Sequence, residues 1–343
     1  MGRKIGVDLH KNSFRVCYYQ NDEKYDFETY HVSVKGLEHF RKGLRKADEL
    51  AVESTGNTGH FVRSIEGKVK RIRVVNPMQF KVISESVKKT DDEDALKIAK
   101  FLSKDMIPEV RMKTKQEGQL SSLIGTRDKF VKLRTALKNK VHNILNANGI
   151  VTKTELLTSD KSLDKVLGNK LDEACLFELE IIVNEIRNLN EAIKKIDAQV
   201  KERGQKLDGF KSVTSITGIG DMSGTILLNT IGDVRYFRDE KALASYFGIV
   251  PRIRSSNETT HMGRITKMGN KIARTALVQS TLIAIRYSPY LRAFYDRLKA
   301  KKGSGKAIIA TARKLLGIVY NTLKNNWVFE DFNNYKLAPQ GAY

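Results

Sequence analysis

Cysteine, paired histidine and long hydrophobic runs are scarce in this 343-residue chain, and each shortage excludes a class of protein. Cys17 and Cys175 stand far apart and form no C-x-x-C motif, which excludes a cysteine-based zinc site and suits a reducing cytoplasm. The six histidines include no i,i+4 pair, so any bound metal is expected to use oxygen ligands. The nearest candidate for a membrane span, residues 276–285, is too short and is broken by polar side chains. We therefore expect a cytoplasmic, nucleoid-associated protein with no membrane partner and no secretory signal.

Acidic residues are also in short supply, because 39 Asp and Glu face 61 Lys and Arg and leave a formal net charge of +22. The imbalance is strong in residues 261–325, which carry 14 basic residues and one acid, Asp296. An excess of this size predicts a polyanionic partner. Nucleic acid is the leading candidate, since neutralising phosphates releases counterions. An anionic membrane surface is the weaker alternative.

Three stretches of different pattern divide the chain. Residues 1–110 alternate short apolar or β-branched runs with amphipathic helix patterns, which predicts an α/β layer with a mixed sheet. Residues 111–206 keep apolar side chains at helical spacing and predict two long helices. These form an antiparallel hairpin or coiled-coil arm, or else part of a helical core. Residues 207–335 predict a mostly helical basic domain, and residues 336–343 a tail.

Four consecutive acids, residues 91–94, need an explanation in so basic a chain. One explanation is a helix N-terminus, because Thr90 is a good N-cap and Glu93 lies three residues on, as in a capping box. Acids in a first turn also suit the helix dipole. This explanation could account for all four.

The helical wheel separates the same four acids. The buried stripe of this helix begins at Ala95 and has Asp91 at its centre, whereas Glu93 points to solvent. Asp92 and Asp94 flank the stripe, and periodicity does not choose between them. An acid on a buried face needs a counter-charge, and no base lies nearby in sequence.

Two further acids come at the ends of hydrophobic strands: Asp8 follows residues 5–7, and Glu53 follows residues 50–52. Carboxylates at adjacent strand ends, facing others from a helix N-terminus, would repel one another unless a divalent cation lay between them. Mg²⁺, with Mn²⁺ as the alternative, takes such oxygen ligands, and two ions together form a phosphoryl-transfer site.

The words GVDLHK, AVEST with TG, and KTDDEDALKIAKFL resemble the DEDD transposases of bacterial insertion sequences, relatives of the Piv invertase that act as RNA-guided serine recombinases. The resemblance implies a ribonuclease-H-like, RuvC-like fold for the first domain. The family pattern K-T-D-x-x-D-A falls on residues 89–95 and selects Asp94 over Asp92. The implied catalytic and metal-binding quartet is Asp8, Glu53, Asp91 and Asp94.

Residues 213–233 predict a helix, a tight glycine turn and a second helix, which together make a helix–hairpin–helix. Gly218 and Gly220 would let backbone N–H groups approach a phosphate at a helix N-terminus. The alternative is that these glycines serve packing alone. The resembled family has this element as P-G-I-G, and Thr217 replaces its proline here.

A serine pair lies in what composition predicts to be a polar loop after Pro251. Four basic residues surround the pair and are candidates for nucleic-acid contact: Arg252, Arg254, Arg264 and Lys267. From composition alone such a pair is usually turn chemistry, because no base at triad-like spacing supports a nucleophile.

The resemblance favours a nucleophile in this serine pair. The family's carboxy-terminal signature ends in G-x-I-[ST]-K-x-G-[ND], which GRITKMGN matches, and its serine attacks DNA phosphate. The match implies that Ser256 is the nucleophile. Ser255 is the runner-up, because Asn257 stands where the family has glycine.

The resemblance as a whole implies a transposase that cleaves and exchanges donor and target DNA through a serine–phosphate intermediate. It further implies Mg²⁺, a structured guide (bridge) RNA, and a dimer or tetramer with a composite active centre. A RuvC-like junction nuclease, with water as nucleophile, is the alternative. Sugar-kinase and actin-like ATPases share a similar first strand, but the glycine-rich adenosine loop and second D-x-G motif that they need are not evident. A non-catalytic nucleic-acid-binding protein is the last alternative.

Overall fold

The computed structural model describes residues 2–84, 90–151, 157–256 and 259–329. The predicted tail, residues 336–343, lies outside the described residues, as do Lys89 and Asn257. Compactness divides the chain into two units, residues 1–115 and a second unit from Gln116 onward. The second unit therefore contains both the helical segment and the basic region.

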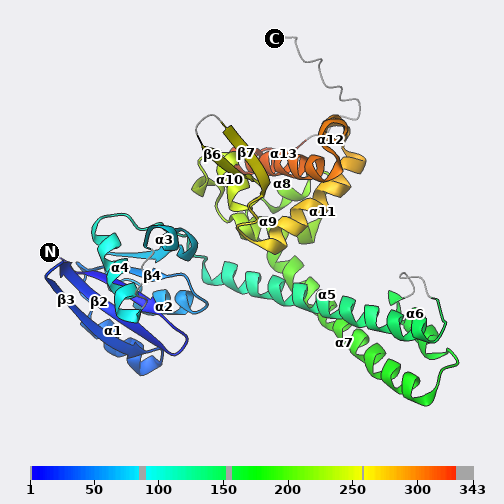
Figure 1. The fold of residues 1–343 in the computed structure, drawn as a ribbon, viewed down its shortest axis with the longest axis horizontal. Helices are drawn as coiled ribbons and strands as arrows, with labels where there is room; N and C mark the ends of the chain where they lie inside the picture. The colour runs from blue at the N-terminus through cyan, green and yellow to red at the C-terminus, as the bar shows by residue number, and fades with distance from the viewer. Residues whose placement is uncertain (1, 85–89, 152–156, 257–258, 330–343) are drawn as a thin grey trace, which may run out of the picture. The chain divides into compact units, whose positions relative to one another are not determined.

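The first unit is a five-stranded mixed sheet with helices packed on it (Figure 1). Its elements are β1 (Lys4–Leu9), β2 (Ser13–Asn21), β3 (Lys24–His31), α1 (Val34–Gly43), β4 (Glu49–Glu53), α2 (Thr58–Ile65), β5 (Arg71–Val75), α3 (Pro77–Ser84) and α4 (Asp91–Ser103). The strand order is β3-β2-β1-β4-β5, and only β2 is antiparallel to its neighbours. The predicted mixed sheet is confirmed, and its order is consistent with a ribonuclease-H-like fold.

Both faces of the sheet are buried at its central strands β1 and β4. On one face Phe14 of β2 meets Phe40 of α1 and Phe61 of α2 edge to face, with ring centroids 5.2 and 5.1 Å apart. On the other face, Phe80 of α3 and Ile98 of α4 share a second cluster with residues of β4 and β5. Burial on both sides explains why β1 and β4 have near-continuous apolar sequences.

Gly6 sets the distance between β1 and α4. A Cβ atom at Gly6 would lie 2.1 Å from the carbonyl oxygen of Ala95 and 2.5 Å from the backbone nitrogen of Ala99. Ala95 and Ala99 are themselves fully buried. The missing side chain therefore lets the helix backbone rest directly on the strand, at the start of the helix stripe that the sequence predicts.

The second unit is mostly helical. Its elements are α5 (Lys115–Ala147), α6 (Asp160–Leu167), α7 (Glu173–Gly204), α8 (Phe210–Thr214), α9 (Asp221–Ile231), η2 (Val234–Tyr236), α10 (Glu240–Tyr246), β6 (Pro251–Ser256), β7 (Thr259–Ile265), α11 (Lys271–Tyr287), α12 (Pro289–Lys302) and α13 (Ser304–Asn325). Polar contacts between α5 and α7 run in opposite chain directions: Arg134 donates to Asn190 at 2.8 Å, and Lys140 pairs with Glu178 at 2.9 Å. The two long helices are therefore antiparallel neighbours.

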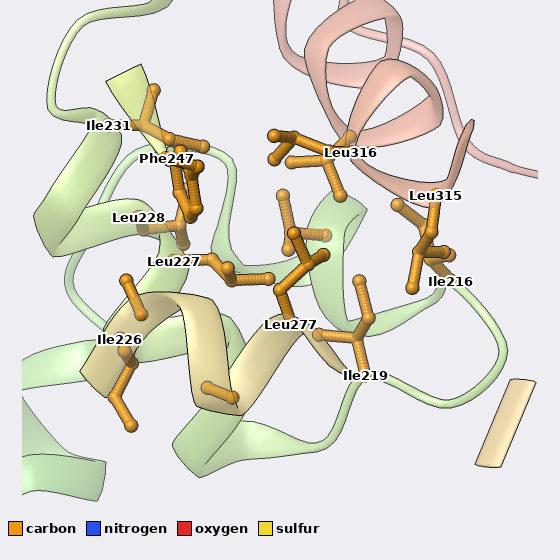
Figure 2. Packing of buried hydrophobic residues seen from close by; sticks show 14 of the residues in the cluster. Ile216, Ile219, Ile226, Leu227, Leu228, Ile231, Phe247, Leu277, Leu315 and Leu316 are labelled. Carbon is orange, nitrogen blue, oxygen red and sulfur yellow. The ribbon is translucent and has the colours of Figure 1, made fainter. Parts of the chain in front are cut away.

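The largest hydrophobic cluster of this unit joins α8, α9, α11 and α13 with the beginning of α5. Figure 2 shows Ile216 and Ile219 directed into the cluster together with Leu277 and Leu315. Ile219 lies between the two predicted phosphate-binding glycines and is 3% exposed. The glycine turn is thus fixed from inside by an apolar side chain.

The prediction of a polar loop around the serine pair is wrong. β6 and β7 form an antiparallel hairpin in which Ser255 lies opposite Thr260 and Ser256 opposite Thr259. Ile253 of this hairpin is 59% exposed and Met262 opposite it 73%. Neither apolar side chain is buried, so this hairpin has no buried face to demand alternating apolar residues. The sequence therefore lacks the alternation by which a half-buried strand is recognised.

None of the helices in the described ranges combines the length and the hydrophobicity that crossing a membrane requires.

Candidate metal centre and nucleic-acid interface

Asp8 and Glu53 lie at the same edge of the sheet because β1 and β4 are parallel. Val7 is opposite Val52 in the strand register, and the two acids are the next residues along each strand. Asp8 is only 6% exposed, and Glu53 is half-buried. The carboxylate of Asp8, on a hydrophobic strand, is therefore almost completely buried.

The acidic first turn of α4 faces this edge. The Thr90 hydroxyl accepts a hydrogen bond from the Glu93 backbone N–H at 3.3 Å, which confirms the predicted N-cap. Asp91 lies one turn before Ala95 and brings a carboxylate oxygen into one group with Asp8. The Asp91 side chain is nevertheless 65% exposed, so the stripe to which it belongs is buried only from Ala95 onward.

The structure separates the two acids that periodicity left open. Asp92 turns to β2 and forms an ion pair with Arg15. Asp94 is half-buried, lies 3.9 Å from Lys97, and contributes to the negative potential at Asp8. A guanidinium therefore already holds Asp92, and the choice of Asp94 as a metal ligand stays a prediction.

The electrostatics at Asp8 show that the other three acids influence its ionisation, although only Asp91 shares a group within 4.8 Å with it. Burial raises the pKa of Asp8 from its ordinary 3.8 to about 6. The neighbouring His10 opposes this rise in pKa, whereas Asp91, Asp94 and Glu53 each add to it. Four carboxylates from two strands and one helix thus act on one another, and an arrangement of this kind fits a divalent cation.

His10 is a residue of this centre that the sequence argument missed. Its Nε2 atom lies 3.2 Å from an Asp8 carboxylate oxygen and 3.3 Å from one of Asp91. Ligand atoms of these three residues all fall within 4.8 Å of one another. A search for i,i+4 pairs finds histidines on one helix face only. The signal here was instead the D-x-H spacing across the end of a buried strand, with Asp8 inside β1 and His10 directly after it.

Two neighbouring loops are tied together beneath the centre. The Asn57 side-chain amide donates to the carbonyl oxygen of His10 at 2.8 Å. The Thr58 hydroxyl donates to the carbonyl oxygen of Glu53 at 2.7 Å and accepts from the Thr55 N–H at 2.8 Å. The loop after β4 therefore fixes both its own acid and the residue that follows β1.

The two predicted phosphate-binding glycines of the second unit differ in their surroundings. Gly218 has a left-handed backbone (φ +94°), and a Cβ there would lie 2.6 Å from the carbonyl oxygen of Ser280 and 2.9 Å from the Cβ of Ala284. Packing against α11 alone thus requires a glycine at this position. Gly220 has no atom within 4 Å of such a Cβ and caps the N-terminus of α9. Of the two glycines, Gly220 is thus the one with open space around it, at the N-terminus of α9.

The predicted basic residues and serines belong to the hairpin and to the turn after it. Arg252 and Arg264 are exposed on β6 and β7, and Arg254, Ser255 and Ser256 continue the backbone of β6. Lys267 is exposed in a left-handed conformation (φ +56°), with its N–H bonded to the Gly248 carbonyl at 3.0 Å. These residues lie in the second unit, whereas the four acids lie in the first.

Family models match both regions. A DEDD transposase model of the IS110 type, described as "Transposase", matches residues 5–148, and a model described as "Transposase IS116/IS110/IS902 family" matches residues 211–296. The chain belongs to the IS110/IS116/IS902 transposase family. The first match covers all four acids, and the second covers the glycine turn and the β6–β7 hairpin.

Full-length relatives of this transposase agree with the assignment. It is 25% identical over 331 residues to the "Transposase for insertion sequence element IS1111A" of Coxiella burnetii, over 93% of this chain and 89% of the relative. It is 26% identical over 349 residues to the "Pilin gene-inverting protein" of Moraxella bovis, over 95% and 97%. Members of the family cleave and join DNA, and DEDD transposases use divalent metal. This chain is therefore a DNA-cleaving and DNA-joining enzyme with a candidate metal site.

Proposed function

We propose that this transposase catalyses Mg²⁺-dependent cleavage and exchange of donor and target DNA through a serine-linked intermediate, guided by a structured bridge RNA. The observation that carries the proposal is the buried Asp8 carboxylate, which shares one group within 4.8 Å with His10 and Asp91 and also feels the charges of Glu53 and Asp94. Two relatives, one named a transposase and the other a gene-inverting protein, also point to DNA rearrangement. The proposed assembly is a homodimer or tetramer in the cytoplasm.

Asp8, Glu53, Asp91 and Asp94 would hold the divalent ion, with Mg²⁺ preferred and Mn²⁺ the alternative. When bound, the ion supplies Lewis-acid polarisation of a phosphate oxygen. The protein's own part is preorganisation. The Thr58 and Asn57 hydrogen bonds fix the acid-bearing loops before substrate arrives, which lowers the entropic cost of reaching the reactive geometry.

The nucleophile in this proposal is the Ser256 hydroxyl, with Ser255 as runner-up, and this assignment rests on the family resemblance. The serine oxygen attacks a DNA phosphorus atom as the bond from phosphorus to the leaving DNA oxygen breaks. The hydroxyl proton passes to solvent, and the leaving oxygen takes one up. Because one phosphodiester replaces another, rejoining needs no external energy source. The side chains that would balance the added charge on phosphate are Arg252, Arg254, Arg264 and Lys267.

A reconstituted reaction tests the proposal. The purified chain is incubated with a donor–target DNA pair, Mg²⁺ and the element's own non-coding flank supplied as RNA. We expect strand exchange only when all components are present, together with a covalent protein–DNA adduct on denaturing gels. Ser256→Ala should abolish the adduct and exchange, and Ser255→Ala should retain both.

A RuvC-like junction nuclease is the second candidate, and the DEDD family match over residues 5–148 favours it. Such an enzyme would use water as nucleophile, so it would form no adduct and Ser256→Ala would keep full cleavage activity. Asp8→Asn should abolish cleavage under both proposals. Exchange that proceeds without added RNA would contradict the guided reaction.

A further inference from the structure

His10 lies where a metal ligand would lie, between two acids of the candidate centre. Its Nε2 atom is 3.2 Å from Asp8 and 3.3 Å from Asp91, on the side of the ring that faces both carboxylates. Resting on the proposed function for the acids themselves, we propose that His10 is a nitrogen ligand of the divalent ion that Asp8 and Asp91 hold. It would make one ion site a mixed nitrogen–oxygen site.

The spacing of the three side chains supports coordination. Adjacent ligands of an octahedral ion with bonds of about 2.1 Å lie about 3.0 Å apart. The two measured separations from Nε2 are close to that value, and the three ligand atoms form one group within 4.8 Å. Little side-chain movement is therefore needed to place all three around one cation.

The backbone of His10 is fixed on both sides. Its N–H donates to the Ser13 carbonyl at 2.9 Å, and its carbonyl oxygen accepts from the Asn57 side chain at 2.8 Å. These two bonds fix the backbone of His10 while its ring faces the centre and 48% of the side chain remains exposed.

A nitrogen ligand changes which ion the centre prefers. Mg²⁺ is a hard cation that takes oxygen ligands almost exclusively, whereas imidazole suits first-row transition ions. The mixed site should therefore favour Mn²⁺ over Mg²⁺ more strongly than the four carboxylates alone would. The competing interpretation is that His10 only supplies positive charge to the acids and is displaced when metal binds.

Mn²⁺ itself is the probe that separates these interpretations. The full chain is titrated with Mn²⁺ at about pH 8, above the ordinary pKa of histidine, and free Mn²⁺ is followed by electron paramagnetic resonance. Pulsed measurements then detect nitrogen-14 coupled to the bound ion. We expect a nitrogen coupling in the wild type that His10→Ala removes. The matched control is His60→Ala, at an exposed histidine of α2 in the same unit, which should keep the coupling.

Affinity gives a second readout that does not depend on activity. His10→Ala should weaken Mn²⁺ binding by at least the roughly 10- to 100-fold that loss of an outer-shell partner costs, and Mg²⁺ binding by clearly less. His10→Asp should restore an oxygen ligand, keep metal binding, lose the nitrogen coupling and shift preference toward Mg²⁺. Circular dichroism checks that each variant is folded.

The outcomes separate this proposal from the proposed function. Saturable Mn²⁺ binding without a nitrogen coupling that depends on His10 would overturn the histidine ligand and leave the carboxylate centre intact. Equal losses of Mn²⁺ and Mg²⁺ affinity in His10→Ala would also overturn it. If no Mn²⁺ binding depends on Asp8, so that Asp8→Asn has no effect, both the histidine ligand and the proposed function are wrong.

Discussion

In the metal-free protein, ionisation of the buried Asp8 lowers the free energy of unfolding. Its folded pKa of about 6 lies above the ordinary 3.8, so the folded state binds a proton more tightly than the unfolded chain does. The contribution of Asp8 to the free energy of unfolding is therefore most favourable below pH 4, and it falls as pH rises to about 6. The size of that fall is on the order of 2–3 kcal/mol.

Asp8→Asn should remove this pH dependence, because asparagine does not ionise. In metal-free buffer near neutral pH the variant should be more stable than the wild type by on the order of 2 kcal/mol, and near pH 4 the two should match. Urea unfolding across this pH range with a chelator present measures both. Asp92→Asn, which breaks the pair with Arg15, is the control and should give no gain. If the stability of the wild type does not change between pH 4 and 6, burial and the neighbouring acids do not raise the pKa of Asp8.

At the scale of elements, the contact between β1 and α4 governs the centre through Gly6. Gly6→Ala places a methyl group 2.1 Å from the Ala95 carbonyl oxygen, so α4 must move away from the sheet. We expect a loss of about 3 kcal/mol in unfolding free energy and weaker Mn²⁺ binding, since Asp91 and Asp94 move with the helix. Chemical denaturation and metal titration measure the two effects.

Gly43→Ala is the matched control for this substitution, because no atom lies within 4 Å of a Cβ at Gly43, near the end of α1. It should be neutral or stabilise the protein by up to about 1 kcal/mol. Normal metal affinity in Gly6→Ala would show that α4 does not depend on this contact for its position.

The glycine turn before α9 offers a second matched pair. Gly218→Ala should destabilise the protein by about 2 kcal/mol or more, since it meets both a left-handed backbone and the Ala284 side chain. Gly220→Ala should change stability by less than about 0.5 kcal/mol, because its surroundings are open. If the N-terminus of α9 contacts phosphate, Gly220→Ala should still weaken DNA binding, which fluorescence anisotropy with a labelled duplex measures. Unchanged DNA affinity would leave both glycines a structural role only.

The elements of the first unit were predictable from sequence because their signals are local. β1 and β4 have short apolar runs that end in acids, and α4 has an N-cap before a buried stripe at Ala95. β6 and β7 were not predictable in this way. A two-stranded ribbon with polar and exposed side chains lacks the hydrophobic alternation on which strand prediction depends.

The candidate site was predictable only in part. The acids could be picked out because carboxylates after hydrophobic strands are unusual, and the choice of Asp94 came from the family pattern. His10 was not, because its proximity to Asp91 depends on α4 folding back onto β1 across more than 80 intervening residues. The pair of Asp92 with Arg15 is equally non-local. Tertiary packing decides which charged side chains pair with one another.

At the scale of the whole molecule, the chain contains two compact units, and the four acids all belong to the first. Mg²⁺ should therefore stabilise one unit selectively, by about 2.7 kcal/mol when its concentration is one hundred times the dissociation constant. The only tryptophan of the chain, Trp327, lies in the second unit and reports on that unit's unfolding.

Thermal unfolding followed by two probes tests this selectivity. With Mg²⁺ present, circular dichroism should show a transition that moves to higher temperature, while the Trp327 fluorescence transition stays in place. Asp8→Asn should abolish the Mg²⁺-dependent shift. A single transition that moves in both signals would show that the two units unfold together.

The assembly of the centre from β1, β4 and α4 also bears on how copies of such a gene decay. A deletion that removes any one of these elements removes part of the candidate metal centre and leaves the remaining acids without their partners. Truncated gene copies should thus lose DNA cleavage activity completely in one step, without an intermediate stage of reduced activity. Truncated copies that keep the basic second unit would still encode its excess of positive charge, which favours nucleic-acid binding and hence competition with an intact copy.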